Sequence, residues 1–368
     1  MQQLKWATAI TTAFMLYDYL KYPEAKIHSL IGTALRQIDP EEAHGWSLKL
    51  ASVFPMYKVD EIISCTLLGK VIDSPIGIAA GYSKNGEAIA NLANLGFGMI
   101  EIGSITPCPQ EGNAKPRVFR ISEAEAVINR YGFNSDGHTI VAERIKRLPD
   151  LKSKLFGVNL GKNKFPQVSA ADDYIQGMKS FSDVADYLVI NISSPNTPGL
   201  RALQGKDKLQ ALFKELKPYA NKPVLLKVAP DLHDQDISDI CATIKDFKFI
   251  KGLIISNTTI ERPTSSLVNG SEIGGLSGKP LYPIMKQTLS KFCLTLKNEI
   301  KSKELQIIGC GGISTSDQII ELAEMGCSAV QLYTGLIFNG VSLIPKLQKE
   351  IKLKLGDKQW DDIVGSRL

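Results

Sequence analysis

The side chains best suited to chemistry follow a short apolar stretch near the middle of the chain. Leu188, Val189 and Ile190 predict a strand buried on both faces, and Pro195 and Pro198 end it abruptly. The loop after this strand carries hydroxyl and amide groups, on Asn191, Ser193, Ser194, Asn196 and Thr197. Barrel and open-sheet enzymes place their chemistry just past the carboxyl ends of parallel strands, so this loop is the first candidate for an active site. The alternative is a turn in which the same side chains bond only their own backbone.

Other apolar runs end in small or polar residues, as a site of this kind requires: Ala80, Gly81, Ser104, Asn159, Lys227, Ser256, Asn257, Thr258, Gly311, Gly312, Tyr333 and Thr334. Glu101 and Asp231 have no second acid at a local spacing, so a glycosidase-type carboxylate pair has little support. The four histidines show no metal-binding spacing and the six cysteines no C-x-x-C. We therefore expect no metal site and reduced thiols without disulfides.

Two glycine-rich stretches and a lysine indicate what the site binds. Residues 274–278 and 309–312 suit a phosphate held by backbone N–H groups after the last strands of a barrel. Lys227 ends a strand among apolar neighbours, where a charge is costly unless it meets an anion. Amides suit a planar ring with alternating C=O and N–H groups, and a lysine stabilises negative charge on it. A flavin fits this description, and flavin redox chemistry is the expectation.

The elements that position these residues form a regular series from Ile76 onward, in which eight short apolar runs alternate with helical patterns. The runs are Pro75 to Ala80, Met99 to Ile105, Leu155 to Leu160, Tyr187 to Ile192, Pro223 to Val228, Gly252 to Ser256, Leu305 to Gly309 and Ala329 to Tyr333. They predict an α/β fold of the (β/α)8 or TIM barrel class, with a doubly wound open sheet as the alternative. Residues 62–68 and 70–72 predict a hairpin across Gly69 at the barrel bottom, and residues 116–134 an insertion that shapes the pocket.

A small helical extension is expected ahead of the barrel. The apolar run from Trp6 to Leu20 spans about 15 residues against the ~20 of a membrane-spanning helix, so we interpret residues 1–22 as an anchor remnant or interfacial segment. Residues 23–58 predict two amphipathic helices, the second capped by Asp39 with Pro40 at its first position. The apolar stripe of that second helix is Ala43, Trp46, Ser47, Leu50, Ala51 and Phe54. Both helices pack on the barrel or lie in a membrane surface, and the sequence favours packing.

Length and charge are those of an ordinary globular protein. The chain has 368 residues, 44% hydrophobic and 22% charged, which is enough for one large domain with an appendage. Its net charge of +5 is spread among acids rather than gathered in a stripe, so no nucleic-acid partner is expected. A phosphate cofactor or an anionic membrane agrees with this charge.

A series of motifs stands in order between about residues 76 and 338: GIAAGYSKNGEA, GFGMIEIGSITPCPQEGNAKPRVFR, INRYGFNSDG, GVNLGKNK, VINISSPNTPGLRALQGK, LLKVAPDL, NTTIERP, GGLSGKPL, IIGCGGI and VQLYTGL. With the DPEEAH helix pair ahead of them, they resemble the membrane-associated, quinone-reducing class 2 dihydroorotate dehydrogenases. Tyr82-Ser83 departs from the usual Phe-Asp, and Cys108 and Cys310 depart from Lys and Val. The departure at Ser83 falls at a position where the family contacts the flavin through its backbone.

The resemblance implies roles residue by residue. Ser194 is the implied base, with Thr197 beside it on the proton path. The implied substrate-binding residues are Lys84, Asn129, Arg130, Tyr131, Gly132, Phe133, Asn191, Asn196, Asn257 and Thr258. The implied FMN-binding residues are Ala80, Gly81, Lys84, Ser104, Asn129, Asn159, Asn191, Lys227, Ser256, Gly278, Gly311, Gly312, Tyr333 and Thr334. The implied quinone site is His44, Arg120 and Tyr333.

The same resemblance implies oxidation of (S)-dihydroorotate to orotate in de novo pyrimidine (UMP) synthesis. Ser194 would remove the C5 proton, FMN would take the hydride, and ubiquinone would reoxidise the FMN. Residues 59–368 would form the FMN-binding barrel and residues 23–58 a quinone tunnel from the lipid surface. A monomer is expected at the mitochondrial inner membrane, or peripherally on a bacterial cytoplasmic membrane. The alternatives are a flavin-free, phosphate-binding barrel synthase or isomerase and a non-catalytic membrane-associated barrel.

Overall fold

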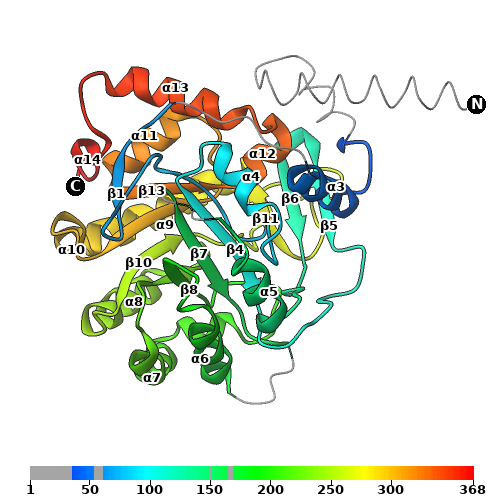
Figure 1. Ribbon diagram of the computed structural model, residues 1–368, viewed down its shortest axis with the longest axis horizontal. Helices are drawn as coiled ribbons and strands as arrows, with labels where there is room; N and C mark the ends of the chain where they lie inside the picture. Colours follow the sequence, from blue (N-terminus) through cyan, green and yellow to red (C-terminus); the bar gives the residue numbers. More distant parts are fainter. Residues whose placement is uncertain (1–34, 54–60, 150, 152, 165–168) are drawn as a thin grey trace, which may run out of the picture.

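A closed barrel of eight parallel strands forms the centre of the computed structural model, which describes residues 35–53, 61–149, 151, 153–164 and 169–368 (Figure 1). The strands are β3 (Ile76–Ile78), β4 (Met99–Ile105), β7 (Leu155–Leu160), β8 (Tyr187–Asn191), β9 (Val224–Val228), β10 (Ile250–Ile255), β12 (Gln306–Cys310) and β13 (Cys327–Leu332). They pair in chain order, and β13 closes the barrel by pairing Val330 with Ile76 of β3. The predicted (β/α)8 barrel is confirmed, and each of the eight apolar runs falls on one barrel strand.

The barrel strands are apolar because both of their faces are covered. Every residue of β7 and β8 is buried, since one face fills the barrel and the other packs under helices. The surrounding helices are α4 (Ile89–Asn94), α5 (His138–Ile145), α6 (Ala170–Phe181), α7 (Lys206–Leu216), α8 (Asp234–Asp246), α9 (Leu281–Thr295), α10 (Lys297–Lys301), α11 (Ser316–Glu324), α12 (Thr334–Asn339), α13 (Leu343–Leu355) and α14 (Trp360–Ile363). Capping boxes start α6, at Ser169 and Asp172, and α11, at Thr315 and Gln318.

The predicted hairpin is present as β1 (Cys65–Leu67) and β2 (Lys70–Ile72), joined across Gly69. The backbone N–H of Leu68 donates to Oε1 of Gln306 at 2.6 Å. Gln306 is the first residue of β12, so the hairpin lies at the amino-terminal end of the barrel, as expected.

The predicted insertion holds two antiparallel strands, β5 (Val118–Ile121) and β6 (Ala126–Asn129). A third strand, β11 (Gly275–Gly278), joins β6 from the loop after β10. This small sheet has its own core of Ile121, Ala126, Ile128 and Leu276. The sequence predicted the insertion but did not indicate its partner strand.

Helix α3 (Pro40–Val53) contacts β5 and α4 beside the small sheet (Figure 1). Asp39 caps it, because its Oδ1 accepts the backbone N–H of Glu41 at 2.9 Å and of Glu42 at 3.0 Å. Within the predicted stripe Ala43 and Ala51 are buried, whereas Trp46 is 53% exposed because the helix approaches the barrel through its small residues.

Two expectations for the extension fall outside the described residues. The first predicted helix lies almost wholly within residues 1–34, and the apolar run from Trp6 to Leu20 lies entirely there. Within the part of the chain that the structure describes, no helix combines the length and apolar character needed to cross a bilayer.

Candidate functional site

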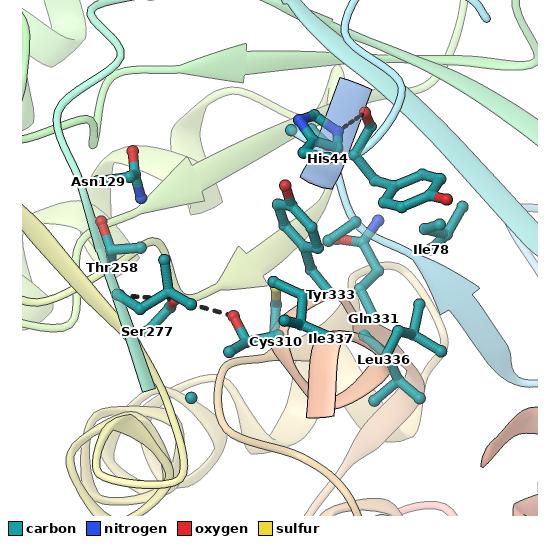
Figure 2. A pocket seen from close by; sticks show the side chains of 18 of the residues that line it. His44, Ile78, Asn129, Thr258, Ser277, Cys310, Gln331, Tyr333, Leu336 and Ile337 are labelled. Carbon is teal, nitrogen blue, oxygen red and sulfur yellow. Dashed lines mark hydrogen bonds between the residues drawn. The ribbon is translucent and has the colours of Figure 1, made fainter. Parts of the chain in front are cut away.

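A pocket of about 300 Å³ lies at the carboxyl ends of the barrel strands and continues beneath α3 (Figure 2). Figure 2 shows the Tyr333 ring with Asn129 and Thr258 on one side and Ile78 on the other. The structure brings most of the predicted site residues to this pocket: His44, Ala80, Gly81, Lys84, Ser104, Arg120, Asn129, Tyr131, Gly132, Phe133, Asn191, Ser194, Asn196, Lys227, Ser256, Asn257, Thr258, Gly278, Gly311, Gly312, Tyr333 and Thr334.

Three predicted site residues do not line the pocket. The guanidinium of Arg130 donates to Glu272 Oε2 at 2.7 Å and lies over the Phe119 ring. Successive side chains of an extended segment point to opposite faces, so Arg130 points away where its neighbours Asn129 and Tyr131 point inward. Asn159 lies behind the pocket wall, and Thr197 is buried with no hydrogen-bond partner for its hydroxyl among the residues that the structure describes.

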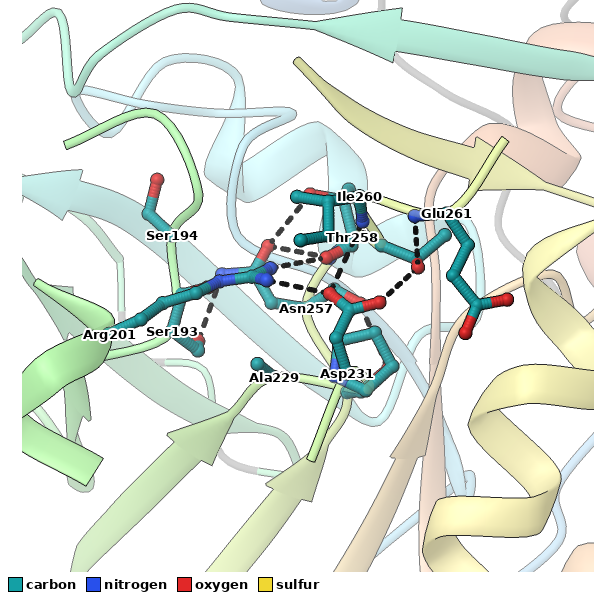
Figure 3. Close-up of polar contacts among 12 residues, drawn as sticks. Ser193, Ser194, Arg201, Ala229, Asp231, Asn257, Thr258, Ile260 and Glu261 are labelled. Atoms are coloured by element: carbon teal, nitrogen blue, oxygen red, sulfur yellow. Dashed lines mark hydrogen bonds and ion pairs between the residues drawn. The ribbon is translucent and has the colours of Figure 1, made fainter. Parts of the chain in front are cut away.

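The loop that carries Ser194 is held from behind by an arginine (Figure 3). Arg201 donates through Nε to the Ser193 carbonyl at 2.9 Å and through a terminal nitrogen to the Thr258 carbonyl at 2.9 Å. Its other terminal nitrogen donates to Asp231 Oδ2 at 2.6 Å. Figure 3 shows the Ser194 hydroxyl pointing away from this cluster. The Ser194 hydroxyl accepts the Asn196 backbone N–H at 3.3 Å, a contact that stabilises negative charge on its oxygen.

One buried acid, Glu101, determines how the amides of the pocket are oriented. Glu101 is 0% exposed, and its carboxylate accepts Nδ2 of Asn159 at 2.9 Å and Nε2 of Gln331 at 2.6 Å. A carboxylate only accepts, so the oxygen of Asn159 must face away from Glu101. That oxygen accepts from the Ser104 hydroxyl and from Nδ2 of Asn191 at 3.1 Å. The donor and acceptor pattern at the barrel top is therefore fixed.

Lys227 is the central cation of the pocket and is 5% exposed. Its Nζ lies 4.0 Å from Oε1 of Glu101, so the two buried charges compensate each other. This position agrees with the sequence argument that Lys227 is not a surface lysine.

A second lysine, Lys84, stands between the amides and α3. Its Nζ donates to the Gly81 carbonyl at 2.8 Å and lies 4.0 Å from the centre of the Tyr131 ring. Burial lowers the pKa of Lys84 to about 8, against the opposing effect of Glu87 and Glu41. Lys84 is therefore mostly protonated at neutral pH.

The end of the pocket beneath α3 is largely apolar, with Leu35, Pro40, Ala43, Leu336 and Val341 among its lining residues. His44 stands there with its Nε2 2.8 Å from the Tyr82 carbonyl. A carbonyl only accepts, so Nε2 carries the proton and Nδ1 is left as an acceptor. Burial, then the charge of Lys84, lowers the pKa of His44 to about 3, so the ring is neutral. Arg120 adds a buried Nε that has no partner among the described residues.

The glycine end of the pocket is built by close backbone packing. Gly278, Gly311 and Gly312 have positive φ angles of 95°, 138° and 69°. A Cβ on Gly312 would lie 2.6 Å from the Gly278 carbonyl oxygen, so a side chain there would push the ends of β11 and β12 apart. The Thr334 hydroxyl donates to that of Ser277 at 2.8 Å across this end.

The charges around the pocket favour anionic ligands. Arg36, Lys84, Arg120 and Lys227 line it, and among the lining residues that the structure describes there is no Asp or Glu. An amide-rich floor, a buried lysine and a glycine end without side chains fit a ring-bearing phosphate compound such as a flavin mononucleotide. Within the described ranges no three His, Cys, Asp or Glu side chains lie close enough together to hold a metal ion.

Three residues that support the pocket escaped the sequence reasoning: Gln331, Arg201 and Arg117, whose guanidinium carbon lies 5.2 Å from the centre of the Tyr131 ring. Each contributes through a partner far away in the chain, such as Glu101, which is 230 positions from Gln331. Gln331 offered one local sign, since it stands in the last apolar run, where a buried amide requires a polar partner.

Comparisons with known proteins agree with this geometry. Residues 62–355 match the family described as dihydroorotate dehydrogenase. The mitochondrial dihydroorotate dehydrogenase (quinone) of Mus musculus is 41% identical over 348 residues, 89% of this chain and 86% of that protein. The dihydroorotate dehydrogenase (quinone) of Bartonella tribocorum is 42% identical over 344 residues, 90% of this chain and 93% of that protein. A crystal structure of DHODH from Eimeria tenella in complex with ferulenol aligns with a TM-score of 0.83 at 34% identity, covering 89% of this chain and 96% of that one.

Proposed function

This chain belongs to the dihydroorotate dehydrogenase family, and on that premise we propose that it oxidises (S)-dihydroorotate to orotate in pyrimidine biosynthesis with a quinone as acceptor. One observation carries the proposal. The Ser194 hydroxyl lines the same pocket as the amides of Asn129, Asn191 and Asn257, and that pocket continues to an apolar end under α3. A polar substrate and an apolar acceptor thus each have a matching end of a single pocket.

Ser194 is the proposed base that takes the C5 proton of the substrate. A serine hydroxyl is a weak base, so its loop has to exclude water and pass the proton on. Ser194 is 6% exposed, and Arg201 holds the loop through Ser193. The hydroxyl of Thr197 is buried without a partner in the described part of the chain, and it is the proposed acceptor of this proton from Ser194.

Lys84 and the pocket amides are the proposed substrate anchors. Lys84 supplies a positive charge for the substrate carboxylate, and Asn196 and Asn257 offer donors and acceptors to the ring. Asn257 is oriented by Ser193, because its Nδ2 donates to the Ser193 hydroxyl at 3.0 Å. Tyr131, Gly132 and Phe133 also line the pocket. Arg130 supports it from outside through Glu272 rather than contacting the substrate.

FMN is the proposed cofactor and, when bound, supplies the hydride acceptor. Lys227, Ser104 and Asn191 would hold its ring, and the glycine end with Thr334 its phosphate. Asn159 would act indirectly, since it orients Asn191. Lys227 is placed to stabilise negative charge on the ring, because it lines the pocket whereas its buried partner Glu101 does not.

Ubiquinone is the proposed acceptor, entering between α3 and the barrel. The Arg120 Nε–H, which has no partner within the described ranges, is placed to donate to a quinone oxygen, and Tyr333 separates this end from the polar one. The exposed Trp46 and Ile38 near α3 suit a lipid surface. We propose that residues 23–58 contribute the quinone tunnel and residues 59–368 a catalytic barrel that acts as a monomer. Residues 1–22, for which a membrane-associating role is expected, lie outside the described residues. The proposed location is the mitochondrial inner membrane, with a bacterial cytoplasmic membrane as the alternative.

The test is a visible spectrum of the purified protein followed by anaerobic addition of dihydroorotate. The expected result is a flavin absorption that bleaches on addition and returns with a short-chain quinone. A protein that stays colourless after addition of FMN would contradict the proposal and favour a flavin-free barrel enzyme.

A further inference from the structure

Lys84 shares an aromatic ring with a second cation. The Lys84 ammonium lies 4.0 Å from the centre of the Tyr131 ring, and the guanidinium carbon of Arg117 lies 5.2 Å from the same centre. Lys84 and Tyr131 line the pocket, whereas Arg117 stands behind it and is 6% exposed. The Tyr131 ring therefore connects Lys84 with Arg117 by two cation–π contacts.

The partner of Arg117 comes from α3. The Arg117 terminal nitrogen NH2 donates to Glu41 at 2.7 Å and its Nε to the same carboxylate at 3.1 Å, a two-point contact that fixes the geometry. The other terminal nitrogen donates to the carbonyls of Glu111 at 2.6 Å and Asn113 at 2.9 Å. Glu41 lies in the first turn of α3, the helix that also carries His44. Helix α3, which covers the apolar end of the pocket, is thus connected through Glu41 and Arg117 to the end of the pocket proposed to bind the substrate.

We propose that Glu41 and Arg117 are a positioning pair for Lys84, through which helix α3 contributes to the capture of an anionic substrate. The inference rests on the proposed function, in which Lys84 holds the substrate carboxylate. Neither member of the pair lines the pocket, so both act through Tyr131 and Lys84 rather than by touching the substrate.

Glu41 and Arg117 act on the pKa of Lys84 in opposite directions. The groups that face Lys84 are Glu87 of its own loop, Glu41 and His44 of α3, and Arg117 and Tyr131 of the insertion. Burial lowers the pKa of Lys84 to about 8, Glu87 and Glu41 raise it, and Arg117 lowers it. Loss of the Glu41 charge should therefore lower the pKa of Lys84 further, and loss of the Arg117 charge should raise it.

The experiment titrates Lys84 in the full-length, FMN-loaded protein labelled with [6-¹³C]lysine, with the resonance assigned by Lys84→Arg. Glu41→Gln is expected to shift the titration midpoint down and Arg117→Gln to shift it up. Both variants break the same ion pair, so a purely structural role would move both midpoints in one direction or neither. Asp73→Asn is the matched control, because it breaks a comparably buried 2.7 Å pair with Lys154 at the other end of the barrel.

Binding of orotate, followed across pH in the same proteins, completes the test. Affinity for orotate should fall as rising pH deprotonates Lys84. We expect this fall at a lower pH than in wild type for Glu41→Gln, and at a higher pH for Arg117→Gln. An unshifted midpoint in Glu41→Gln overturns the proposal even if Arg117→Gln does not fold. Shifts of the same sign in both variants, or an orotate profile that does not follow the Lys84 midpoint, also overturn it. Failure of the proposed function is a separate result, a wild-type flavin that dihydroorotate does not reduce.

Discussion

The carboxylate of Asp231 accepts a hydrogen bond of 2.6 Å from the guanidinium of Arg201. Asp231 follows β9, and it also accepts from the Thr259 hydroxyl and, at 3.2 Å, from the Ile260 backbone N–H. Arg201 in turn donates to the backbone of Ser193. The pair therefore joins the loops after β8, β9 and β10, and sets the position of the proposed base from outside the pocket.

Replacing Arg201 by lysine should slow turnover without loss of FMN. A lysine cannot reproduce three donors in a fixed fork, and a displacement of about 1 Å at a reacting group costs up to ~100-fold in rate. We expect flavin reduction by dihydroorotate, measured by stopped flow, to slow by about 10- to 100-fold. Arg262→Lys is the matched control, because Arg262 also donates to backbone carbonyls, none of which belongs to the loop that carries Ser194. Equal rates in wild type and Arg201→Lys would contradict the positioning role.

Ser194→Ala should keep FMN and lose most of its turnover. The hydroxyl is needed for proton abstraction, and general base catalysis contributes about 10²- to 10⁴-fold. The measurement is flavin reduction at neutral pH beside the flavin content of the purified protein. Ser182→Ala, at a buried serine away from the pocket, is the control and should be unaffected. A loss under about tenfold would remove Ser194 from the mechanism.

Lys227→Met should weaken FMN binding and lower the melting temperature. The change leaves the Glu101 carboxylate buried without its cation, and unpaired buried charges are strongly destabilising. Adding Glu101→Gln should recover part of the lost melting temperature without restoring FMN affinity. The measurements are fluorescence titration with FMN and thermal unfolding, with Lys154→Met as control. Normal FMN affinity in Lys227→Met would exclude a role for this lysine at the cofactor.

Arg120→Ala and His44→Ala should separate the two half-reactions. Both residues lie at the apolar end, so reduction by dihydroorotate should stay close to wild type while reoxidation by a short-chain quinone slows. Arg120 is expected to have the larger effect, because no described residue accepts from its buried Nε whereas the His44 N–H is already bonded to Tyr82. Stopped-flow reoxidation that is unchanged in both variants would place the quinone route elsewhere.

Acid stability should depend on His138. Burial lowers the pKa of this histidine to about 4, and its Nε2 has no partner among the described residues. The unfolded chain binds a proton near pH 6.5 while the folded protein does not, so the free energy of unfolding falls as the pH drops from 6.5 towards 4. Each pH unit costs about 1.4 kcal/mol. The measurement is denaturant unfolding at pH 7 and pH 5. Between these pH values the free energy of unfolding should fall less in His138→Gln than in wild type, and as much as in wild type in the control His233→Gln.

The barrel was predictable because its signal is local. Each strand is a short apolar run, and the residues just after it, such as Asn191 and Lys227, fall at the pocket without further information. The role of Glu101 was not predictable, because no second acid lies near it in the sequence and its partner Gln331 is 230 positions away. The Arg117 and Glu41 contact spans 76 positions, and no spacing rule connects them. Contacts of this kind follow from barrel closure, which a linear pattern does not contain.

The small sheet over the barrel mouth has a consequence for the order of biosynthesis. The Ser277 hydroxyl of β11 bonds the Val127 carbonyl of β6, 150 positions earlier in the chain. At ~5–20 residues per second, β5 and β6 leave the ribosome roughly 8–30 s before their partner strand exists. During this interval Ile121, Ala126 and Ile128 lack Leu276, the β11 residue of their small core. The interval between synthesis of β3 and of its partner β13 is longer still. The nascent chain therefore carries the β5–β6 pair without its third strand while a further 150 residues or so are synthesised.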